Sequence, residues 1–305
     1  MLSWIILFLV MFIVAVLFSG KAARTKQRAQ TASQDAITEA HRNFLTTEGE
    51  QRRNGADVLA MTKDPGVIST LLRGRRNPAG SHADDYCVDR ALRSLCESLG
   101  LDATQARRDY DLKAIGITPV NDLVPWFAST DPVLRDAAMQ KVALAVQEAP
   151  SGKFADRILA LAFSGSAEFN LKQRAAETLV MAHQLDRLVR RAIELLETDS
   201  DSRSGHDDAI EVLGRFDAGA EAIPCLIKQA QEQRWGMSPR AIRALTRIVL
   251  SKGETLPTDA LQSIRDLLTR PVLESIADPD DPGKTNVETV NTAELQTLVS
   301  DLLDN

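Results

Sequence analysis

The sequence has few aromatic residues and few alternating segments. Phenylalanine, tryptophan and tyrosine together make up 5% of the 305 residues, while alanine, leucine and charged residues are abundant. This composition favours helices that pack through small and aliphatic side chains over sheets, which are rich in aromatic and β-branched residues. Few segments show the period of two expected of a half-buried strand. We therefore predict an all-α fold.

The three cysteines argue against a disulfide framework. Cys87 and Cys96 are nine residues apart in one helical pattern, which places their Cα atoms about 13 Å from each other. A disulfide requires Cα atoms less than about 7 Å apart, and Cys225 would be left over in any pairing. We interpret all three as small hydrophobic residues in a reducing compartment.

Motifs of known catalytic chemistry are also missing. The chain has no Gly-x-Ser-x-Gly elbow, and no two of its histidines form a His-x-x-x-His pair: His41, His82, His183 and His206. The segment "DPDDPGKT" partly matches a phosphate-binding loop and a calcium loop. It has Asp278 where the first requires glycine and Thr289 where the second requires glutamate. We predict no catalytic residue, no cofactor and no metal site.

Positive charge is scarce after residue 118. Residues 119–305 carry 20 Lys+Arg and 29 Asp+Glu, a net charge of −9, whereas residues 1–118 carry 16 and 13, a net charge of +3. Phosphate contacts need a cationic face, so we predict no nucleic-acid partner. A basic part beside anionic lipid and an acidic part in solvent fit a membrane-proximal and a distal segment.

One long hydrophobic run opens the chain. Leu2 to Phe18 contains one polar residue and no charge, and a helix over residues 1–20 would match a hydrocarbon core of about 30 Å. Trp4 would lie at one interface. We predict a single-pass transmembrane anchor, as in a bacterial inner membrane. The cations that follow it orient the N-terminus outside and the rest in the cytoplasm: Lys21, Arg24, Lys26 and Arg28.

A cleaved export signal is the alternative to this anchor, with cleavage after the pattern Gly20-Lys21-Ala22. A signal has a basic segment before a shorter apolar run. Here the only charge before the run is the α-amine, and the run is too long. We therefore favour the retained anchor.

Residues 21–118 are predicted to form a basic juxtamembrane helical stalk and preface, with a break at 46–55 and a basic loop at 73–82. Residues 21–45 have a narrow apolar face, which we interpret as a stalk that continues out of the membrane. Gly100 is expected to end one helix and Asp102 to cap the next, at about 103–114. The arrangement of these helices does not follow from the sequence.

Residues 119–270 carry a repeated pattern. Four alanines are spaced by 37, 34 and 32 residues, and each is followed four residues later by valine or leucine: Ala138, Ala175, Ala209 and Ala241 with Val142, Leu179, Leu213 and Leu245. A small alanine lets a helix approach its neighbour closely, and the larger residue one turn later fills the gap. The pattern predicts stacked helix pairs, because one pair cannot bury its apolar face alone.

These residues resemble the HEAT-repeat family of α-solenoids. The matching segments are a proline in two first helices, an Asp-Pro turn and an opening arginine in a second helix: Val124-Pro125-Trp126-Phe127, Ile223-Pro224-Cys225-Leu226, Asp131-Pro132 and Arg135 with Ala138. The resemblance implies first helices bent at the proline. It also implies a structural ladder of charged side chains between repeats at Asp131, Arg135 and Lys172.

The resemblance covers residues 119–270 and leaves 271–305 as an acidic, proline-rich loop followed by a terminal capping helix. The family's di-iron hydroxylases use His-Glu pairs, which this chain lacks, and its DNA glycosylases need a basic face. We predict a non-enzymatic scaffold or adaptor that binds a protein partner on the solenoid surface. The alternative is an enzyme or a lyase-type accessory subunit with a site between repeats.

Overall fold

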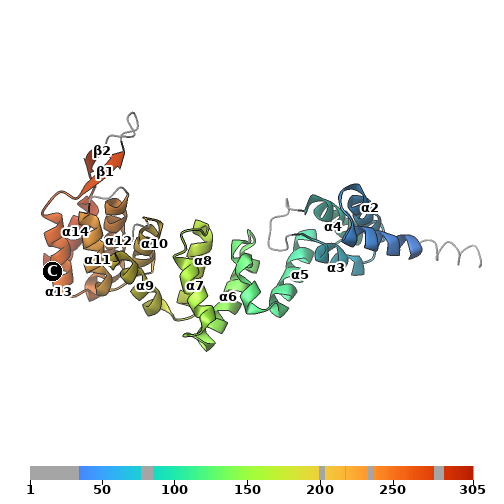
Figure 1. The fold of residues 1–305 in the computed structure, drawn as a ribbon, viewed down its shortest axis with the longest axis horizontal. Coiled ribbons are helices and arrows are strands. Elements are labelled where there is room, and N and C mark those ends of the chain that lie inside the picture. The colour runs from blue at the N-terminus through green and yellow to red at the C-terminus, as the bar shows by residue number, and fades with distance from the viewer. Residues whose placement is uncertain are drawn as a thin grey trace, which may run out of the picture. The chain divides into compact units, whose positions relative to one another are not determined.

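The computed structural model describes residues 34–76, 85–198, 203–216, 218–232, 236–277 and 285–304. This part of the chain is predominantly helical, as the composition predicts (Figure 1). Among the described residues, no helix is both long and apolar enough to cross a membrane. The predicted span at 1–20 and its flanking cations lie outside them, so the anchor stays a prediction.

The chain divides into two compact units. The first holds residues up to Thr118 together with Ser129–Leu134, and the second holds Pro119–Ala128 and everything from Arg135 onward. In the first unit a helix over residues 34–46 is followed by four more: α2 (Gly49–Ala60), α3 (Gly66–Arg73), α4 (Tyr86–Leu99) and α5 (Ala103–Ile117).

Two of the predicted helix boundaries in the first unit are confirmed. Gly100 ends α4 in the left-handed conformation with φ of 69°, a region that costs glycine little. Asp102 caps α5, because its carboxylate accepts the backbone N–H groups of Thr104 and Gln105.

The predicted stalk is wrong for residues 34–46. This helix belongs to the core of the first unit, where Ala40 and Phe44 are buried together with Leu59 and Leu95. The close approach depends on Gly55 of α2, since a Cβ there would lie 2.8 Å from the carbonyl oxygen of Ala40. A narrow apolar face is therefore enough to pack the helix against α2, because its partner presents a glycine.

The first unit also contains buried ion pairs. Arg75 donates to Asp111, with Nη1 3.0 Å from Oδ2, and Arg107 Nη1 lies 3.2 Å from Asp89 Oδ1. Burial raises the pKa of Asp111, while Arg75 and Arg107 oppose that rise. Arg75 belongs to the basic sequence "RGRR" (residues 73–76). Its charge is not exposed to solvent, because this arginine is buried and paired inside the unit.

The second unit begins with two short 3-10 turns and continues with helices: η2 (Val120–Asp122), η3 (Val124–Ala128), α6 (Pro132–Glu148), α7 (Lys153–Ala162), α8 (Phe169–Met181), α9 (Leu185–Glu197), α10 (Arg203–Arg215), η4 (Ala220–Ala222), α11 (Ile223–Gln231), α12 (Met237–Lys252), η5 (Gly253–Thr255) and α13 (Thr258–Leu268). The first α-helix predicted around Val124-Pro125-Trp126-Phe127 is wrong, because these residues form a 3-10 turn in which Pro125 has no N–H for an α-helical ladder. The Trp126 N–H instead bonds the Leu123 carbonyl at 2.9 Å. Pro224 lies in the first turn of α11, where proline needs no kink.

The helices of the second unit stack in pairs (Figure 1). We call α7, α9, α11 and α13 the first helices and α6, α8, α10 and α12 the second helices. Pairs form between α7 and α8, α9 and α10, and α11 and α12; first helices also contact first helices, as α9 with α11 and α11 with α13, and α10 contacts α12. All eight residues of the predicted alanine pattern are 0% exposed, which confirms the predicted buried face.

The predicted acidic loop after residue 270 contains a hairpin. Strand β1 (Leu273–Ala277) pairs antiparallel with β2 (Thr285–Thr289), with Leu273 opposite Thr289. The sequence places the prolines before and between the strands, which leaves β-branched residues such as Ile276 and Val287 free to pair. The chain then forms α14 (Ala293–Asp304), which packs on α12 and α13 with Leu295 and Val299 buried and so confirms the terminal capping helix.

Candidate functional site

The exposed side of the second helices carries a repeated ionic ladder. Positions are counted here from the buried alanine of each helix. Glu177 stands two residues after Ala175 in α8, and its Oε1 lies 2.7 Å from Arg215 Nη2 of α10. Glu211 holds the same position in α10 and lies 3.1 Å from Arg247 of α12. In both cases the glutamate at position +2 of one helix meets the arginine at position +6 of the next.

A second set of ion pairs joins the same helices near their N-terminal ends. Lys172 Nζ of α8 lies 2.6 Å from Asp208 Oδ2 of α10, and the two side chains are only 11% and 9% exposed. Arg240 of α12 pairs with Asp207 of α10. Burial raises the pKa of the Asp208 carboxyl, and the hydrogen bond from Lys172 opposes this rise. Two ion pairs therefore link α8 to α10, and two link α10 to α12.

The three residues predicted from the family resemblance have different partners. Lys172 joins two second helices as described. Asp131 belongs to the first unit, where its Oδ2 lies 2.9 Å from Arg108 Nε. Its partial burial opposes ionisation, but the hydrogen bonds from Arg108 and the Val133 N–H lower its pKa overall. Arg135 lies 3.5 Å from the adjacent Asp136.

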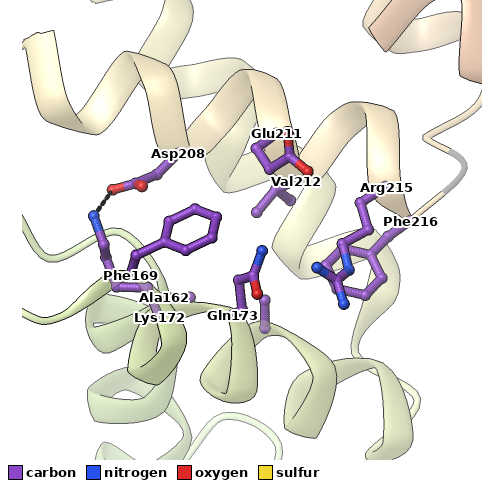
Figure 2. A pocket seen from close by; sticks show the side chains of 10 residues that line it. Ala162, Phe169, Lys172, Gln173, Asp208, Glu211, Val212, Arg215 and Phe216 are labelled. Atoms are coloured by element: carbon purple, nitrogen blue, oxygen red, sulfur yellow. Dashed lines mark hydrogen bonds and ion pairs between the residues drawn. The ribbon is translucent and has the colours of Figure 1, made fainter. Parts of the chain in front are cut away.

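Between α8 and α10 these charges face a narrow crevice (Figure 2). Lys172 and Gln173 line it from α8, and Asp208, Glu211 and Arg215 line it from α10. Its volume is about 20 Å³, which is room for a water molecule and not for a substrate. The charged groups around it are partnered by one another or by the neighbouring helices, so the crevice is a structural joint.

The larger opening lies between α6 and α8, and we call it the α6–α8 groove. It has a volume of about 410 Å³ and a mainly apolar lining that includes two methionines: Asp136, Met139, Gln140, Glu177, Val180, Met181 and Phe216. Met181 is 41% exposed, and Leu144, at the same +6 position of α6, is 60% exposed. Position +6 thus changes from apolar in α6 and α8 to arginine in α10 and α12.

A second open hollow lies on the side of the first helices. Val124 of η3 and Phe154, Arg157, Ile158 and Leu161 of α7 line it, and its volume is about 350 Å³. This hollow is also largely apolar. Arg157 is its charged residue, with no carboxylate in the lining.

The three cysteine thiols are unsuited to act as nucleophiles at neutral pH. Burial raises the pKa of Cys225 to about 12 and raises the pKa values of Cys87 and Cys96, so the thiols remain protonated. His206 is 2% exposed within α10, while His183 lies at the exposed end of α8. Among the described residues, no group of three His, Cys, Asp or Glu side chains could hold a metal ion.

The groove and the ladder were not found by reasoning from the sequence. The sequence does contain a signal for the ladder, because a glutamate at +2 and an arginine at +6 recur at the same positions relative to the buried alanines. The groove has no such signal, since its residues come from α6, from α8 and from Phe216 after α10, and their exposure depends on how these elements pack.

Neither a protein-family model nor a curated protein matches this chain.

Proposed function

We propose that the protein is a membrane-anchored helical-repeat scaffold whose α6–α8 groove binds a helical segment of a protein partner. The groove is the observation that carries the proposal. It is open and mainly apolar, and an apolar groove that takes one face of an amphipathic helix is a common mode of peptide recognition. Met181, which is 41% exposed, suits such a surface because its unbranched side chain adapts to a partner's shape.

The ionic ladder supports the same function. Its glutamates and arginines form ion pairs between neighbouring helices. The charged part of the surface therefore stabilises the register of the stack. The apolar +6 residues of α6 and α8 have no such partner role. We propose that the stack is an α-solenoid of the HEAT type and that its apolar binding surface lies at the α6–α8 end of the ladder.

Substitution of Met181 by glutamate is expected to weaken partner binding at least about tenfold, because a charge would enter the apolar lining. A photo-crosslinker at Gln140 in native membranes, followed by mass spectrometry, identifies the partner and its contact segment. The binding of that segment to Met181→Glu is then measured. Leu250→Glu is the matched control, since Leu250 is 59% exposed on α12, away from the groove.

Two results would contradict this prediction. One is the recovery of no protein crosslinked from Gln140. The other is an equal loss of binding in Met181→Glu and Leu250→Glu, which would indicate a general effect of added negative charge.

The cytoplasmic location is tested separately with reporters at the C-terminus in a bacterial host. A fluorescent-protein fusion is expected to fluoresce and an alkaline-phosphatase fusion to be inactive, because the cations after the span orient it. Replacing Lys21, Arg24, Lys26 and Arg28 by asparagine or glutamine should produce a mixed orientation. Phosphatase activity in the unchanged protein would reverse the assignment.

A further inference from the structure

The β-hairpin has one covered strand and one open strand. Strand β1 packs on α12, and its residues Leu273 to Ile276 are half-buried. Residues 286–289 of β2 are exposed, with Val287 at 56%. Figure 1 shows the hairpin extending away from the helices. Among the described residues the sheet has two strands, so β2 is an edge strand.

The register tells which backbone groups face this edge. The Val290 N–H donates to the Val272 carbonyl at 2.8 Å, directly before the first strand pair. Opposed residues in an antiparallel pair alternate between hydrogen-bonded and non-hydrogen-bonded positions. The hydrogen-bonded positions are therefore Glu288 and Asn286. The backbone N–H and C=O groups that point outward belong to Thr285, Val287 and Thr289.

Negative charge on the hairpin determines which kind of segment can pair with this edge. Glu274 lies directly opposite Glu288, an arrangement that is unfavourable for like charges. Glu274 Oε1 accepts the Gly236 N–H at 2.6 Å, while Glu288 is exposed. Within the two described strands, both charged side chains are therefore negative.

We propose that the outer edge of β2 binds an extended, lysine- or arginine-bearing segment of a protein, which adds a third strand to the sheet. Backbone hydrogen bonds from Thr285, Val287 and Thr289 would hold the strand. Basic side chains would relieve the repulsion between Glu274 and Glu288. A second copy of this chain is the wrong occupant, because it would bring the same two glutamates against the same edge. The site is independent of the α6–α8 groove.

The test uses the full chain in detergent micelles and two fluorescein-labelled peptides. One peptide is Thr-Lys-Val-Lys-Val-Lys-Thr, and the other has glutamate in place of each lysine. Fluorescence anisotropy should show that the lysine peptide binds, with an affinity that falls as salt is added. The glutamate peptide should not bind. Equal binding of both peptides, or no binding of the lysine peptide up to about 1 mM, would overturn the proposal.

Variants at the edge separate strand addition from simple charge attraction. Val287→Pro removes one outward N–H without touching a hydrogen bond inside the hairpin, and should weaken the lysine peptide about tenfold or more. Val287→Thr keeps that N–H and should bind like the unchanged protein. Glu288→Lys should reduce binding of the lysine peptide and leave thermal unfolding intact.

Equal affinities for Val287→Pro and Val287→Thr would refute strand addition. Self-association of the chain that Val287→Pro abolishes would also overturn the proposal, because it would make a second copy the occupant. An unchanged affinity for Glu288→Lys would remove the argument from charge.

Discussion

Substitution of Lys172 by methionine is expected to lower the free energy of unfolding of the second unit by about 3–5 kcal/mol. Asp208 would keep its buried position without a cation, which is the costly case for a buried ion pair. The double variant Lys172→Met with Asp208→Leu should recover most of the loss, because it replaces both charges by apolar groups. Urea unfolding followed by circular dichroism measures the three proteins.

The pH dependence of this loss has a definite sign. Burial already raises the pKa of Asp208 in the folded protein, and removal of Lys172 raises it further. A carboxyl whose folded pKa lies above its unfolded pKa stabilises the fold when protonated and loses that contribution as pH rises. The deficit of Lys172→Met should therefore be largest at neutral pH and shrink toward acid pH, as Asp208 takes up a proton.

The control for this variant is Arg247→Met, which breaks the more exposed pair with Glu211. Exposed pairs of this kind contribute under about 1 kcal/mol, and the loss should depend little on acid pH. If Lys172→Met and Arg247→Met cost the same, the Lys172–Asp208 pair does not behave as a buried one.

The second large effect is expected at Gly214, where α10 and α12 touch. A Cβ on Gly214 would lie 2.7 Å from the Ala244 Cα and 2.8 Å from its Cβ, so alanine there must push the two helices apart. We expect Gly214→Ala to cost about 2 kcal/mol in stability, even though alanine favours a helix over glycine by about 1 kcal/mol. Thermal unfolding by calorimetry measures the change.

Gly116 of α5 provides the matched control for this substitution. A Cβ there would meet nothing within 4 Å. Gly116→Ala should therefore stabilise the first unit by up to about 1 kcal/mol through helix propensity alone. A stabilising effect of both substitutions would show that α10 and α12 are not in close contact at Gly214.

Local patterns predicted the helices well and the special positions less well. The spacing of Ala138, Ala175, Ala209 and Ala241 located the buried face of all four second helices. It could do so because a helix has a fixed period and one of its faces must be buried. Pro125 was read as a bend in a helix, but the segment formed 3-10 turns. In this short segment, the missing N–H of Pro125 had more effect on the backbone conformation than the apolar pattern around it.

The hairpin, and the burial of the helix at 34–46, were not predicted, for a common reason. Each depends on a packing or pairing partner that the local sequence does not identify. Strand β2 is specified by its pairing with β1, and Ala40 is buried because Gly55 lies against it. A local window contains neither fact.

The sequence by itself determined the helical composition, the repeat and its buried face, and it predicts the membrane anchor from a run of apolar residues with cations on one side. These depend on periodicity and composition, which are local properties. Only the tertiary structure decided the partners of Lys172, Glu177 and Glu211, the opening of the α6–α8 groove and the free edge of β2. Each of these requires residues about 30 or more positions apart, or from different elements, to be placed at atomic distance, and packing alone fixes that placement.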